Sequence, residues 1–135
     1  MIEYKIENDL SLEEFKAILE KSTLAERRPM NEPDRLQKML EHGNLIITAR
    51  DNGKIVGVAR SITDFHYATY LSELAVDKAY QKKGIGKELI KQTKLNAPKA
   101  LLILLSAPAA VHFYPKVGMK RHEHCYLLRD VNELQ

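Results

Sequence analysis

The sequence predicts an α/β protein (α+β in the stricter sense) with a mixed, mostly antiparallel central sheet and helices on both of its faces. Three observations support this class. The N-terminal residues alternate between apolar and polar side chains, and Asp51-Asn52-Gly53 marks a hairpin turn between two apolar runs. An apolar run at 68–76 is then followed by a loop, a helical pattern and another apolar run. The expected order is β-α-α-β-β-β-α-β-α-β.

The first half of the chain contains the elements that define one face. A strand is expected where Ile2, Tyr4 and Ile6 alternate with charged residues. Ser11-Leu12-Glu13-Glu14 has the pattern of a capping box, so a helix should start there. A basic loop follows over 23–30. A second helix is expected from 34 to 42, between Pro33 and Gly43.

The second half should complete the sheet. Strands are expected at 45–49, 55–59 and 68–76, a helix from 87 to 97 before Pro98, and a short helix between Pro108 and Gly118. Leu101–Leu105 shows no alternation, which predicts a strand covered on both faces. A last strand is expected at 124–129. The strands 68–76 and 100–105 should be parallel neighbours joined by a right-handed crossover.

Composition limits the classes of function. The 135 residues predict a single domain, 1–135, with 44% hydrophobic residues and a net charge of only +3. That charge does not favour binding of nucleic acid over the whole surface, and the lysines instead concentrate at 78–87. No apolar run is long enough for a membrane span, and the N-terminus lacks the apolar region of a signal peptide. A lone Cys125 fits a reducing cytoplasm and is expected to be a core thiol.

The most informative motif is Gln81-Lys82-Lys83-Gly84-Ile85-Gly86, between the strand ending at Val76 and the helix that follows. Such a loop directs several backbone N–H groups and the positive end of a helix dipole at one point, which favours an anion such as pyrophosphate. Its spacing excludes a Walker-type loop, because Gly86-Lys87 is followed by Glu88. It also excludes the dinucleotide fingerprint, whose third glycine would stand at Leu89.

The remaining pattern, Gln-x-x-Gly-x-Gly, resembles the acetyl-CoA loop of the GNAT superfamily of N-acetyltransferases. The resemblance extends upstream to Leu74-Ala75-Val76 and downstream to Phe113-Tyr114-Pro115-Lys116-Val117-Gly118-Met119, so it covers about residues 45–120. It implies a GNAT-like sheet whose parallel strand pair splays apart to hold CoA. It also implies transfer of an acetyl group from acetyl-CoA directly to a primary amine.

The resemblance assigns roles to particular positions. The loop would bind the pyrophosphate of acetyl-CoA, and Leu74, Ala75 and Val76 would lie along its pantetheine arm, with a backbone N–H near Leu74 polarising the thioester oxygen. Phe113 and Tyr114 would also contact the cofactor, and Tyr114 would protonate the leaving thiolate. The cofactor-binding residues expected in the loop are Gln81, Lys82, Lys83, Gly84, Ile85, Gly86 and Lys87.

The general base is less clearly indicated. Glu73 is a carboxylate in an apolar strand, which suggests either a base acting through water or an anchor for a cationic substrate. Unless a β-bulge intervenes, it should point away from Ser72 and Leu74. Other residues near the expected acceptor side are Asp64, His66, Tyr67 and Tyr70.

The acceptor itself is not specified by the sequence. Glu26, Glu32 and Asp34 suit an amine, whereas Arg27 and Arg28 favour a carboxylate-bearing substrate. We expect the acceptor to be the amine of a small molecule or a protein. We expect no metal, no nucleic acid and no membrane partner, and a homodimer is possible. The alternatives are a CoA-binding sensor or regulatory module without turnover and a nucleic-acid-binding domain that uses the 78–87 lysines, which the lack of an RNA-binding aromatic motif disfavours.

Overall fold

The computed structural model describes all residues, 1–135, and they form two compact units. The first unit comprises residues 1–105 and the second comprises residues 106–135. No helix of the chain is both long enough and apolar enough to cross a membrane.

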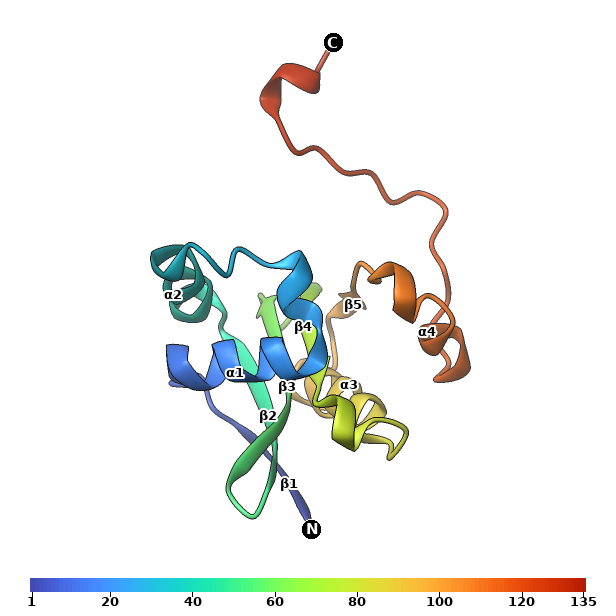
Figure 1. Cartoon of the computed structure of the whole chain (residues 1–135). Helices are drawn as coiled ribbons and strands as arrows, with labels where there is room; N and C mark the ends of the chain where they lie inside the picture. Colours follow the sequence, from blue (N-terminus) through green and yellow to red (C-terminus); the bar gives the residue numbers. More distant parts are fainter. The chain divides into compact units, whose positions relative to one another are not determined.

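The first unit contains one five-stranded sheet in the order β1-β2-β3-β4-β5 (Figure 1). All neighbouring strands are antiparallel except β4 and β5, which are parallel. The mixed, mostly antiparallel sheet is therefore confirmed. Its elements are β1 (Ile2–Ile6), α1 (Leu12–Ser22), a 3-10 helix (Leu24–Arg27), α2 (Pro33–His42), β2 (Leu45–Asp51), β3 (Lys54–Thr63), β4 (Ala68–Val76), a 3-10 helix (Lys78–Tyr80), α3 (Ile85–Asn96) and β5 (Leu101–Ile103).

The two sheet faces bury separate apolar clusters. Helices α1 and α2 cover one face, where Phe15, Ile18 and Leu36 pack against Val58 of β3. Helix α3 covers the other face through Ile85 and Leu89. A Cβ at Gly57 would lie 3.1 Å from Leu89 Cδ1. Because glycine has no Cβ, α3 can approach β3 closely. Both helical layers thus hold β3 and β4, the strands that lead to the candidate site.

The start of α1 departs in one respect from the expected capping box. The Ser11 hydroxyl accepts a hydrogen bond from the Glu14 N–H at 3.1 Å, as expected for an N-cap. The Glu14 carboxylate does not reach back to Ser11, however, because it binds the guanidinium of Arg50 on β2. Only half of the capping box forms, and the other half is exchanged for an ion pair to the sheet.

Strand β5 is covered on one face only, which corrects the expectation for Leu101–Leu105. Leu102 and Leu104 pack against the α3 cluster, whereas Leu101, Ile103 and Leu105 are exposed. The cluster beneath α1 and α2 contains no residue of β5. An edge strand beyond the reach of those two helices has an apolar sequence without having two buried faces.

The second unit contains a 3-10 helix (Pro108–Ala110), α4 (Phe113–Lys116) and a 3-10 helix (Val131–Glu133). The strand expected at 124–129 is wrong, since these residues form neither a helix nor a strand. A strand requires a partner for its backbone N–H and C=O groups, and local alternation does not supply one. Without a sheet around it, Cys125 is exposed, which also corrects its assignment as a core thiol.

Candidate active site

The parallel pairing of β4 with β5 ends soon after it begins. Only Ala68, Thr69 and Tyr70 pair with β5, although β4 continues to Val76. Residues 71–76, except Ser72, therefore pair with β3 on one side, and none of the six has a strand partner on the other. We call this side of 71–76 the free edge of β4. It agrees with the expected divergence of the two parallel strands.

The backbone groups on the free edge follow from the register with β3. In an antiparallel ladder, pairs that exchange hydrogen bonds alternate with pairs whose N–H and C=O groups point outward. Asp77 donates its N–H to the carbonyl of Val56 at 2.9 Å, so this pair belongs to the bonded set. The register places Val76 and Leu74 in the outward set. Their N–H and C=O groups therefore face the free edge, where an extended chain with amide groups can add as a strand.

The loop after β4 is tied back to that strand. The Gln81 side chain donates a hydrogen bond to the carbonyl of Val76 at 3.4 Å. The Asp77 carboxylate accepts the N–H of Ala79 at 2.9 Å and so caps the short 3-10 helix Lys78–Tyr80. The Tyr80 hydroxyl donates to Asp51 at 2.7 Å, and this bond is the first cause that raises the pKa of Tyr80. The loop is thus anchored at its base.

After this anchored segment, the backbone of residues 82–84 forms a turn, which we call the cradle. Lys82 and Gly84 both adopt positive φ angles, of 63° and 81°. Gly84 is the N-cap of α3, and its carbonyl accepts the N–H of Glu88 in the first turn at 3.0 Å. The N–H groups of Lys82, Lys83 and Gly84 donate to no other backbone group. A row of free amides at a helix N-terminus is the arrangement that binds phosphate.

Positive charge surrounds the cradle. Lys82, Lys83 and Lys87 are exposed, and none of them forms an ion pair. Lys83 lies with its Nζ 5.1 Å from the centre of the Tyr80 ring, which holds this ammonium beside the loop. The cradle therefore offers uncompensated positive charge together with free backbone donors.

Glu73 lies beside the free edge and is almost fully buried, with a side chain 1% exposed. Arg60 pairs with Glu73 in the register whereas Ser61 pairs with Leu71, so Ser72 is an extra residue in a β-bulge. The bulge places Glu73 beneath the face covered by α1 and α2. Its carboxylate accepts from the Nε of Arg60 and, at 2.7 Å, from the Nε of Arg28.

The sequence did not identify Arg60 as a site residue, and it suggested a carboxylate-bearing substrate as the partner of Arg28, whereas the structure places Arg28 on Glu73. Arg60 is buried, and its Nη1 donates to the carbonyl of Met39 at 2.8 Å. The sequence did contain a signal for Arg60. It is a cation in an apolar strand, and the next strand along the chain carries the anion Glu73. No such signal exists for Arg28, which reaches Glu73 from a loop 45 residues earlier.

Asp64 serves the turn between β3 and β4. Its carboxylate accepts the backbone N–H groups of His66, Tyr67 and Ala68, at 3.0, 2.8 and 3.0 Å. These bonds, the one from Tyr67 foremost, lower the pKa of Asp64 to about 2. A carboxylate so stabilised as an anion is a weak proton acceptor, so its contacts favour a structural role in the turn.

In the second unit, Phe113 and Tyr114 begin α4. Their rings meet edge to face with centroids 5.1 Å apart. Burial raises the pKa of the Tyr114 phenol, so the hydroxyl stays protonated at neutral pH. The N–H of Met119 donates to the carbonyl of Tyr114 at 3.0 Å, and Gly118 has a φ of 101°, which closes this short helix. The approach of Tyr114 to the free edge of β4 stays a prediction.

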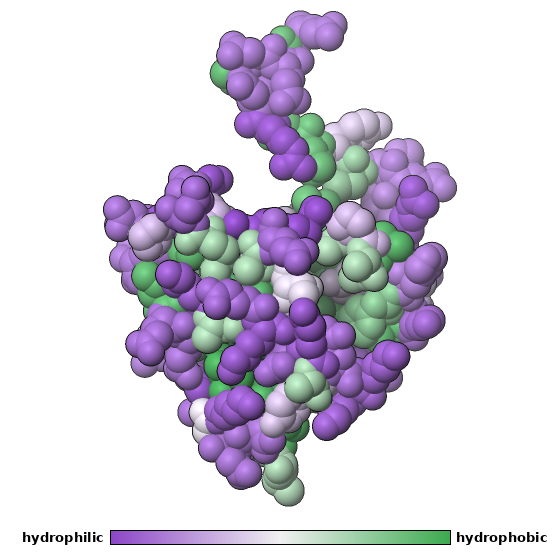
Figure 2. Space-filling model, viewed as in Figure 1, coloured by the Kyte–Doolittle hydropathy of each residue, from purple (hydrophilic) through white to green (hydrophobic).

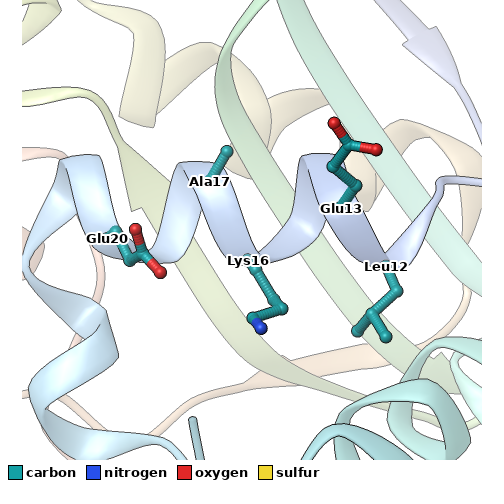
Figure 3. Close-up of a pocket in the computed structure, with 5 residues that line it drawn as sticks. All are labelled: Leu12, Glu13, Lys16, Ala17 and Glu20. Atoms are coloured by element: carbon teal, nitrogen blue, oxygen red, sulfur yellow. The ribbon is translucent and has the colours of Figure 1, made fainter.

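The acidic residues considered for the acceptor side lie on the surface of the first unit. Glu26, Glu32 and Asp34 are exposed, and Figure 2 shows a largely hydrophilic surface over α1 and α2. A shallow depression lies along α1, and Figure 3 shows Leu12 and Lys16 projecting from one side of the helix and Glu13 and Ala17 from the other. All residues that line it belong to α1, and none is an expected site residue. The depression is therefore separate from the candidate site.

Comparisons with known proteins identify the fold and the family of the chain. No curated protein sequence matches the chain. A GNAT family acetyltransferase from Streptococcus pneumoniae is 24% identical, with a TM-score of 0.76 over 96% of this chain and 100% of that one. An acetyltransferase from Trypanosoma brucei is 24% identical, with a TM-score of 0.66 over 96% and 99%.

The aminoglycoside N-acetyltransferase AAC(6')-Iy in complex with CoA is 15% identical, with a TM-score of 0.73 over 97% of this chain and 95% of that one. At these identities, the structures establish a common fold. The sequence profile of the acetyltransferase (GNAT) domain matches residues 7–126, which is most of the chain. The chain belongs to the GNAT acetyltransferase family.

Proposed function

We propose that this protein transfers an acetyl group from acetyl-CoA directly to a primary amine of a small molecule or a protein. The observation that carries the proposal is the continuity of the free edge of β4 with the anion cradle. Leu74 and Val76 present outward amide groups, and the loop presents free N–H groups and lysines a few residues later. The two parts match a ligand that has amide groups at one end and a pyrophosphate at the other.

In this proposal, the cradle and the free edge bind different parts of the cofactor. The N–H groups of Lys82, Lys83 and Gly84 bind the pyrophosphate, and Lys87 adds charge from the first turn of α3. The pantetheine amides pair with the carbonyl of Leu74 and the N–H of Val76 as an added strand. This arrangement leaves the N–H nearest the bulge, that of Leu74, to polarise the thioester carbonyl.

The chemical step forms a bond between the amine nitrogen and the thioester carbon and breaks the bond between that carbon and sulfur. The amine loses a proton, which ends in solvent, and the departing thiolate gains one. In this proposal Tyr114 gives its proton to the thiolate, and its raised pKa supports the protonated starting state. The phenolate then recovers a proton from solvent, so the cycle closes without net change in the protein.

The contacts of Glu73 bear on the route of the amine proton. Both of its carboxylate oxygens already accept hydrogen bonds from arginine side chains, and Ser72 Oγ lies 3.0 Å from Oε2. Action as a base through water requires water to reach the remaining acceptor site on Oε1, in a side chain that is 1% exposed. The other role suggested by the sequence, anchoring a cation, is the role its observed contacts support, although the cations are Arg28 and Arg60.

An assay of thiol release against a panel of amines tests the proposal. The panel should include polyamines, an aminoglycoside, free amino acids and peptides with either a free N-terminus or an internal lysine. Calorimetric titration with acetyl-CoA runs in parallel. Saturable thiol release with one amine class supports the proposal. Tight binding of acetyl-CoA with no turnover on any amine would favour a CoA-binding regulatory module.

A further inference from the structure

Arg28 joins the loop before α2 to the bulge in β4. Its Nε donates to Glu73 Oε2 at 2.7 Å, and its Nη2 donates to the carbonyl of Ser72 at 2.8 Å. The guanidinium thus holds the side chain of one residue and the backbone of the residue before it. Its side chain is only 20% exposed. This pair of contacts differs from an ordinary surface ion pair, which holds one carboxylate.

The carbonyl that Arg28 binds belongs to the extra residue of the bulge. Ser72 has no register partner on β3, so its backbone lacks the ladder contacts of its neighbours. Arg28 supplies a charged donor in place of a strand. A planar guanidinium can form both bonds at once, whereas an ammonium cannot reproduce that fork.

Arg60 fixes the same carboxylate from the opposite strand. Its own position is set by the carbonyl of Met39 near the end of α2, at 2.8 Å. Gly43 leaves the space that this side chain uses, because a Cβ there would lie 2.9 Å from Arg60 Cγ. Glu73 is therefore held by Arg60 from β3 and by Arg28 from the loop before α2. It directly precedes Leu74, whose N–H faces the free edge.

We infer that Arg28 is a positioning residue: by holding Ser72 and Glu73, it fixes the direction of the Leu74 N–H toward the thioester oxygen. The inference rests on the proposed function, which assigns that N–H to the carbonyl. It also gives Arg28 an internal role in place of recognition of an acidic substrate. Arg28 acts through the backbone of β4 and contacts neither substrate nor cofactor.

The variant Arg28→Lys tests this role, because lysine keeps the charge beside Glu73 and removes the fork. Arg121→Lys is the matched control, since Arg121 is exposed and forms no ion pair. Three quantities are measured in the full chain: the amide resonance of Leu74 without ligand, the infrared carbonyl band of bound ¹³C-labelled acetyl-CoA, and kcat with the Kd for acetyl-CoA.

In Arg28→Lys we expect a displaced Leu74 resonance, a carbonyl band moved back toward that of free acetyl-CoA, and kcat lowered about tenfold, which corresponds to one weakened hydrogen bond in the transition state. The Kd should stay within about twofold, because the cradle is intact. Ser72→Gly, which gives the bulge the freedom that Arg28 removes, should change the band in the same direction and serves if Arg28→Lys does not fold.

The failures are distinguishable. If wild-type protein binds acetyl-CoA with a displaced carbonyl band and Arg28→Lys shows the same band and kcat, the positioning role is overturned while the proposed function stands. If the wild-type protein does not bind acetyl-CoA, both are overturned.

Discussion

The two ends of the free edge of β4 are built in different ways. At the Val76 end, the cradle consists of backbone N–H groups, and its residues lie within one short loop. At the Ser72 end, the bulge is held by the side chains of Arg28 and Arg60, which come from distant parts of the chain. The first end is encoded locally and the second is encoded by tertiary contacts. Damage to the first should therefore affect binding, and damage to the second should affect stability and rate.

The strongest test of the locally encoded end is Gly84→Glu. A side chain at a φ of 81° is strained, and a negative charge there opposes the pyrophosphate. We expect acetyl-CoA affinity to fall by at least about 100-fold, or about 2.7 kcal/mol. Calorimetry measures it. Gly53→Glu is the control, because Gly53 has a φ of 85° and also meets no atom within 4 Å, but lies in the β2–β3 turn.

Gly53→Glu should share the strain and the added charge while keeping the affinity for acetyl-CoA. Equal loss of affinity in the two variants would show that strain alone is responsible and would remove the cradle from the binding site.

At the other end, Glu73→Gln should mainly reduce stability. Removal of the charge leaves the buried Arg60 without its counterion, and breaking a buried pair in this way costs about 3–5 kcal/mol. Urea unfolding measures the loss. Glu41→Gln breaks an exposed pair with Lys38 and should give no measurable change. A stable Glu73→Gln protein would mean that the arginines find other partners.

The next largest effect concerns the second unit. Tyr114→Phe should lower kcat by about 100-fold if the phenol protonates the thiolate, with little change in the Kd for acetyl-CoA. Because burial raises the pKa of Tyr114, its ionisation should add no limb to the pH profile of the rate near neutrality. Tyr126→Phe, at an exposed tyrosine, is the control. Unchanged turnover in Tyr114→Phe would exclude the acid role.

The smallest effect tests a site residue that the structure assigns to a turn. The pKa of Asp64 is lowered to about 2 from an ordinary value of 3.8. The stability it contributes is therefore complete above pH 3.8 and is lost as the pH falls through about 2. Asp64→Ala should have a lower Tm than wild type at pH 6, and the difference should shrink towards pH 2. Loss of kcat without loss of Tm would instead return Asp64 to the catalytic candidates.

The sequence predicted elements with strong local signals. The turn at Asp51-Asn52-Gly53, the helix start at Ser11 and the cradle after Val76 were all readable because each depends on a few consecutive residues. The strand at 124–129 and the two covered faces of 101–105 were not, because pairing and burial depend on neighbours that alternation and apolarity do not identify. The same limit explains why Glu73 was recognised as unusual while its partners were not.

By itself, the sequence determined the family, the sheet class and the loop that would bind a pyrophosphate, because glycines, caps and short motifs act through local backbone geometry. Only the tertiary structure decided that Ser72 is a bulge residue, that Arg28 and Arg60 converge on Glu73, and that Leu74 and Val76 turn their amides to the free edge. Those features depend on register and on side chains that meet across more than ten residues of chain. Burial makes such contacts strong, and no local pattern records them.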